Sequence, residues 1–137
     1  MSQQAASRPA ARPRPLSPHL TAYRWPITMV MSIVHRITGS ALYFGTLGVG
    51  LWLLAAATSE DWFATLTWAA QSWLGRLVLI GYTWALLHHL LGGVRHLIWD
   101  TGRGLEKANS RKFAWATVIG SVTLTLLVWI AVFWTRS

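Results

Sequence analysis

Long uncharged apolar runs constrain this chain more than any other feature. Residues 113–134 form a run of 22 without a charged side chain, and residues 37–58 form a second run of the same length. About 20 apolar residues cross the hydrocarbon core of a bilayer as a helix, because a helix satisfies its own backbone hydrogen bonds. The two runs therefore predict two transmembrane helices.

A third apolar run lies between them and is less uniform. Residues 77–99 contain three histidines and Arg95, but no acidic residue appears before Asp100. Arg95 stands near the end of the run, where a long basic side chain can reach the membrane surface. We therefore expect an all-α membrane protein with three spans, at about 27–58, 75–99 and 113–134.

The composition agrees with a membrane protein. Hydrophobic residues make up 53% of the 137 positions and charged residues only 12%, with a mean hydropathy of +0.39. The absence of cysteine excludes a disulfide framework, cysteine-ligated zinc and an iron–sulfur cluster held by this chain. The net charge of +8 would suggest nucleic acid in a soluble protein. Because the charges fall outside the apolar runs, membrane topology explains them and we expect no nucleic-acid partner.

The chain divides into a tail and a membrane domain. Residues 1–24 are rich in proline, arginine and alanine and lack the apolar stretch of a signal peptide. Residues 25–137 hold all three spans, and we expect them to form one transmembrane domain in contact with the lipid bilayer.

The loop charges predict the orientation. Residues 59–75, expected to be a loop, contain Glu60 and Asp61 and are free of basic residues until Arg76, whereas the tail and residues 101–112 carry most of the arginines and lysines. By the positive-inside rule, the N-terminus is cytoplasmic and the C-terminus periplasmic. We expect a bacterial inner membrane, because the tail is short and the chain compact. The mitochondrial inner membrane is the alternative.

Two histidines seven residues apart indicate a cofactor. His89 and His96 are separated by nearly two helical turns, so they share one face about 10 Å apart. A histidine at membrane depth is costly, and a buried imidazole can ligate a haem iron. The alternative is a pair of polar residues satisfied at a helix–helix seam. His88 points about 100° away from His89, and we expect it to find such a seam partner.

Four donors fall at one depth on the cytoplasmic side of this arrangement. His96 is about 6 Å and His89 about 16 Å from the cytoplasmic end of the second span. The layer of His96 also holds His35, Arg36 and Arg95, as a haem's two propionates would require. Ser32 and Arg36 lie four residues apart on one helix face and can hydrogen-bond a quinone carbonyl. The alternative is an interfacial arginine beside a serine bonded to its own backbone.

Two motifs carry a family resemblance. Residues 32–39 read S-x-x-H-R-[IV]-[ST]-G, and residues 89–100 read H-x6-H-x3-D with G-[IV]-R-H inside. With the three-span layout, they make the chain from about Arg14 to Trp134 resemble the cytochrome b membrane-anchor subunits of succinate dehydrogenase, respiratory complex II.

This resemblance implies roles for five residues. The anchor supplies one axial ligand of haem b, a position that falls on His89, and the second membrane-anchor subunit supplies the other. His35, His96 and Arg36 then lie near the haem propionates. The quinone-binding serine and arginine of the family fall on Ser32 and Arg36.

The resemblance also implies partners and a reaction. Succinate is oxidised on a flavoprotein subunit, an iron–sulfur subunit passes the electrons on, and ubiquinone accepts them. The anchor is then an electron-transfer subunit and no enzyme by itself. Two alternatives stay open, a cofactor-free structural anchor and another quinone-linked cytochrome b such as a fumarate reductase anchor. A di-haem cytochrome would need further mid-membrane histidines, and the third span has none.

Overall fold

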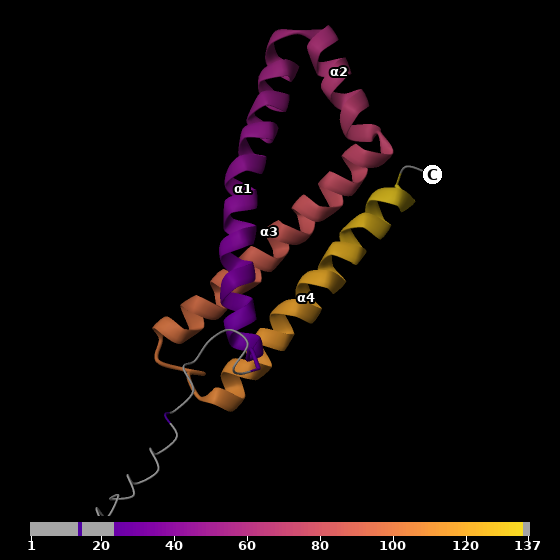
Figure 1. Cartoon of the computed structure of the whole chain (residues 1–137). Coiled ribbons are helices and arrows are strands. Elements are labelled where there is room, and N and C mark those ends of the chain that lie inside the picture. Colours follow the sequence, from indigo (N-terminus) through magenta and orange to yellow (C-terminus); the bar gives the residue numbers. More distant parts are fainter. Residues whose placement is uncertain (1–13, 15–23, 136–137) are drawn as a thin grey trace, which may run out of the picture.

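The computed structural model describes residue 14 and residues 24–135, which form four helices (Figure 1). The described residues contain no strand, so the predicted all-α class is confirmed. Most of the tail 1–24 lies outside the described residues. The helices are α1 (Ile27–Thr58), α2 (Glu60–Gln71), α3 (Trp73–Asp100) and α4 (Lys107–Trp134).

Three of these helices are long and apolar enough to cross a membrane, namely α1, α3 and α4. The shorter two have 28 residues each, or about 42 Å at the usual rise, which exceeds the roughly 30 Å of a hydrocarbon core. The prediction of three transmembrane helices is confirmed. Helix α4 begins at Lys107, six residues before the predicted span. Its first turns carry charges, so they extend beyond the apolar run that the prediction measured.

The segment after α1 differs from the expected loop, because Glu60–Gln71 forms helix α2. The Ser59 hydroxyl accepts a hydrogen bond from the Trp62 backbone N–H at 3.3 Å and so caps the helix. Glu60 and Asp61 lie in the first turn, where negative charge interacts favourably with the helix dipole. The prediction of a loop was wrong because residues 59–75 were judged only by whether they could span the membrane. The ability of Ser59 to cap a shorter helix was not considered.

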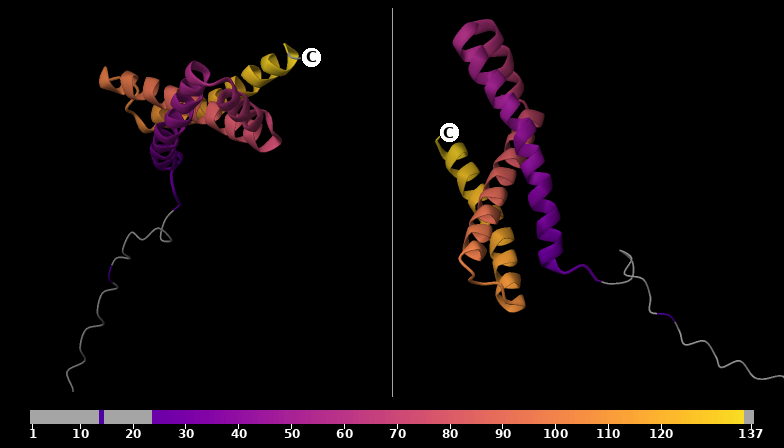
Figure 2. Two further views of the ribbon diagram at one scale, coloured as in Figure 1. Left: turned by 90° about the horizontal axis from the view of Figure 1, so that it is seen from above. Right: turned by 90° about the vertical axis from the view of Figure 1, so that its left-hand side faces the viewer.

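Helices α1 and α3 cross at one end of the molecule and diverge towards α2, whereas α4 runs along α3 (Figure 1, Figure 2). Small residues mark the close approach. A Cβ added at Gly39 of α1 would lie 2.9 Å from the His89 ring, and one added at Gly92 of α3 would overlap the His35 ring. The two helices therefore come close together where the motif histidines lie.

The helix seams are built mainly from small and polar side chains. The most buried apolar positions are Met31 and three alanines, and buried polar residues outnumber them. Most large apolar side chains are exposed on the helix surfaces. Membrane helices pack in this way, since small residues allow close approach and lipid solvates the apolar exterior. The buried polar residues are Thr38, His88, Arg95, Thr117, Ser121 and Thr125.

Candidate functional site

Three of the predicted site histidines meet between α1 and α3. The rings of His35 and His89 are stacked, with centroids 4.0 Å apart and an interplanar angle of 16°. The His96 ring stands edge-on to His35 with centroids 5.3 Å apart. The seven-residue spacing thus places His89 and His96 on one side of α3, where both approach the same α1 residue.

A hydrogen bond to α1 fixes the orientation of His89. Its Nδ1 lies 3.1 Å from the backbone carbonyl oxygen of His35 and 3.4 Å from the Thr38 hydroxyl. A carbonyl oxygen can only accept, so Nδ1 carries a proton, and in the neutral ring the lone pair is then on Nε2. Metal-binding histidines commonly donate their other ring N–H to a carbonyl in this way. His89 is half-buried and has the protonation pattern of a metal ligand.

Neither the His35 carbonyl nor the Thr38 hydroxyl was predicted as a partner of His89. Both belong to the motif at residues 32–39, in which Thr38 follows His35 by three positions. The Thr38 hydroxyl also donates to the backbone carbonyl of Val34 at 2.9 Å. Helical spacing within the motif shows that the carbonyl and the hydroxyl are neighbours, but only the packing of α1 on α3 shows what they contact.

His88 occupies a different environment on the other side of α3. It is only 2% exposed, and its Nδ1 lies 3.1 Å from the hydroxyl of Ser121 on α4. The predicted seam partner of His88 is therefore confirmed. Its ring also lies 5.1 Å from that of Trp84, one turn earlier in α3. His88 connects α3 to α4 and is held away from the His35–His89 stack.

Arg95 also lies away from the His89 side of α3. It was expected in the same layer of the membrane as His96, and its place along α3 agrees with that layer. It is 4% exposed and lines a small space of about 150 Å³ between α3 and α4, with Phe113 and Thr117 among its neighbours. Its guanidinium carbon lies 5.0 Å from the centre of the Trp99 ring. Its Nε and Nη1 atoms have no hydrogen-bond partner among the described residues.

Ser32 and Arg36 are both exposed on α1, one turn apart. The Ser32 hydroxyl makes no hydrogen bond to another described residue. In contrast, the hydroxyls of Ser40 and Thr46 on the same helix donate to carbonyls four residues earlier, at 3.1 and 2.8 Å. The alternative interpretation of Ser32, a serine bonded to its own backbone, is therefore not what the structure contains. Its hydroxyl is available to an external acceptor or donor.

Comparison with known proteins gives these residues a context. The sequence matches the family described as succinate dehydrogenase/fumarate reductase transmembrane subunit over residues 10–128. The chain belongs to this family. Both motifs and all three spanning helices lie within or overlap the matched region.

Individual relatives carry the same description. The chain is 48% identical over 120 residues to the succinate dehydrogenase cytochrome b556 subunit of Paracoccus denitrificans, covering 88% of this chain and 92% of that protein. It is 35% identical over 117 residues to the corresponding subunit of Rickettsia conorii, covering 85% and 91%. The mitochondrial cytochrome b560 subunit of Sus scrofa is 43% identical over 97 residues, covering 67% and 56%. The predicted membrane-anchoring cytochrome b subunit of complex II is confirmed.

Proposed function

We propose that His89 would hold the iron of haem b through its Nε2 atom. The observation that carries this proposal is the Nδ1 contact with the His35 carbonyl at 3.1 Å, which leaves Nε2 able to coordinate a metal. The name cytochrome b, borne by the relatives, implies a haem b. When bound, haem b supplies a one-electron carrier within the membrane.

His35, His96 and Arg36 are suited to the propionate end of the same group. The Nε2 atom of His35 is buried and has no hydrogen-bond partner among the described residues. Such an orphaned atom costs stability unless a ligand satisfies it. A propionate oxygen is an acceptor of the right charge for imidazole and guanidinium donors. Because His96 and Arg36 are exposed, they can contribute donors from two helices.

Ser32 and Arg36 would bind ubiquinone. The Ser32 hydroxyl, which has no hydrogen-bond partner among the described residues, and the Arg36 guanidinium share one face of α1, four residues apart. Both can donate hydrogen bonds to a quinone carbonyl oxygen, and the fixed positive charge stabilises negative charge that develops on that oxygen.

The rest of the assembly is proposed from the family. The relatives are named as subunits of succinate dehydrogenase, and this chain holds no cysteine for an iron–sulfur cluster, so an iron–sulfur subunit would deliver the electrons to the quinone. A flavoprotein subunit would oxidise succinate, and the second membrane-anchor subunit would supply a further ligand to the haem iron. The present chain transfers electrons and orients the quinone without itself oxidising succinate.

The charge distribution supports the proposed orientation in a bacterial inner membrane. Glu60 and Asp61 flank one end of the bundle, at the start of α2. The connection from α3 to α4 and the first turns of α4 carry four basic residues at the opposite end. The N-terminus and this end are then cytoplasmic, and the C-terminus is periplasmic. The basic residues are Arg103, Lys107, Arg111 and Lys112.

The quinone assignment is tested by comparing two succinate-driven activities of the purified complex. Arg36→Gln removes a charged donor worth about 1.5–3 kcal/mol, so quinone reduction should fall at least about tenfold. Ser32→Ala should cause a smaller, several-fold loss, and Ser40→Ala is the matched control because that hydroxyl is bonded to the backbone. Dye-linked succinate oxidation should stay unchanged in all three variants. An equal fall of both activities in Arg36→Gln would assign Arg36 a structural role instead.

A further inference from the structure

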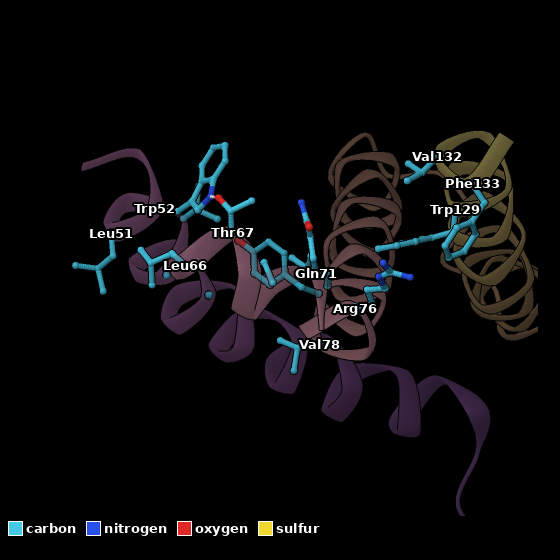
Figure 3. Close-up of a pocket in the computed structure, with 16 residues that line it drawn as sticks. Leu51, Trp52, Leu66, Thr67, Gln71, Arg76, Val78, Trp129, Val132 and Phe133 are labelled. Atoms are coloured by element: carbon cyan, nitrogen blue, oxygen red, sulfur yellow. Dashed lines mark hydrogen bonds between the residues drawn. The ribbon is translucent and has the colours of Figure 1, made fainter. Parts of the chain in front are cut away.

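A large apolar cleft lies at the opposite end of the molecule from the histidines. Its volume is about 940 Å³, near the upper end of the range for small-molecule pockets. Figure 3 shows its walls, which come from α1, α2, α3 and the C-terminal part of α4. None of the residues assigned to haem or quinone lines it. Its apolar lining includes Val49, Leu51, Leu66, Leu79, Val132 and Phe133.

The cleft is closed on the side that faces the histidines. Its lining residues nearest to the crossing of α1 and α3 are Gly45 of α1 and Tyr82 of α3. A Cβ added at Gly45 would overlap the Tyr82 ring, so the two helices are in contact there. Beyond this point the histidine contacts keep α1 and α3 together. An occupant of the cleft therefore cannot pass between α1 and α3 towards the histidines.

The end of the cleft beside α2 is polar and carries one positive charge. Thr67 and Gln71 of α2 and Arg76 of α3 line this end (Figure 3). The Trp52 indole N–H donates to the Thr67 hydroxyl at 3.3 Å and ties α2 to α1. Arg76 is exposed and forms no ion pair with a described residue. The cleft thus combines an apolar interior with a cationic rim at the membrane interface.

We propose that this cleft binds one glycerophospholipid of the leaflet on the α2 side. An acyl chain would lie between α1 and α3, and the phosphate would contact Arg76 and Gln71. The lining of α1 runs from Gly45 to Trp52, about 10 Å at helical rise, which is less than the roughly 15 Å that half of the hydrocarbon core measures. The cleft therefore fits within one leaflet.

A helix of another subunit suits the cleft less well. A helix is about 10–12 Å across and needs the full thickness of the membrane. The Gly45–Tyr82 contact closes the space between α1 and α3 halfway along this path, so a spanning helix could lie against the cleft but could not fill it. In an amphipathic molecule, a flexible apolar tail can fill the closed end of the cleft, and an anionic head group can pair with the positive charge of Arg76. This proposal does not rest on the haem or quinone assignments.

The test counts phospholipid in the purified, intact complex by mass spectrometry after extensive detergent washing. Gly48 lines the cleft, and an added Cβ there meets nothing within 4 Å, so Gly48→Leu fills the cleft without displacing the chain. We expect it to retain one phospholipid fewer per copy than the wild type. Arg76→Gln should also lose that lipid. Gly50→Leu and Arg103→Gln are the controls, because Gly50 is equally open and neither residue lines the cleft.

A photo-crosslinking residue at position 48 provides the second measurement. We expect the adduct to have the mass of a phospholipid. Equal phospholipid counts in the wild type and Gly48→Leu would overturn the proposal. So would an adduct with another subunit or with a quinone, which would identify a different occupant.

Discussion

The two sides of α3 place adjacent histidines in opposite environments. On the α4 side, His88 is almost completely buried, and its Nδ1 is hydrogen-bonded to Ser121. On the α1 side, His89 is half-buried, is stacked on His35, and contacts a backbone carbonyl through the same ring atom. One helical step of about 100° thus separates a residue that holds two helices together from one suited to ligation. The doubled histidine is two residues with different roles.

The glycines of α3 show the same division, and they provide the largest expected effect, because stability and haem content should fall together. A side chain at Gly92 would overlap His35, whereas one at Gly93 would meet nothing within 4 Å. Gly92→Leu should force α1 from α3 and destabilise the chain by about 1–3 kcal/mol, with loss of bound haem. Gly93→Leu should leave the thermal unfolding temperature unchanged and lower only the haem content, because the residue lies between His89 and His96. The measurement is haem content and unfolding temperature of both purified variants.

Equal destabilisation by the two leucine substitutions would contradict the expected difference between Gly92 and Gly93. It would mean that the approach of α1 to α3 does not depend on the space at Gly92. Unchanged haem content in Gly93→Leu would show that the cofactor does not cover that part of α3.

The His88 side makes a smaller and opposite prediction. Ser121→Ala leaves a buried imidazole nitrogen without its partner, which costs about 1–3 kcal/mol. The thermal unfolding temperature should fall while haem content and quinone reduction stay at the wild-type level. Thr123→Ala, an exposed position on the same helix, is the matched control. A loss of haem in Ser121→Ala without a loss of stability would place the His88 side in the cofactor site.

Much of this division could be predicted from the sequence. The uncharged runs predicted three spans because membrane length is a direct requirement on sequence. Helical spacing predicted that His89 and His96 share a side and that His88 has a seam partner. These predictions use only the geometry of one helix.

Contacts between helices could not be predicted in the same way. The stack of His35 on His89 depends on where α1 crosses α3, and the spacing within either segment does not contain that information. Arg95 was grouped by depth with His96, but it faces α4 because its angle around α3 is closer to that of His88. Helix α2 was missed because its 12 residues are too few to span the membrane, so membrane length is no guide to it, and because its capping by Ser59 was not considered.

The ligand state of the haem iron tests the central claim most directly. Electron paramagnetic resonance of the oxidised complex should show a low-spin, six-coordinate haem b in the wild type and in His88→Leu. In His89→Leu this signal should be lost, either with the haem or through conversion to a high-spin form. An unchanged low-spin spectrum in His89→Leu, together with a changed one in His88→Leu, would contradict the assignment of His89 as the ligand.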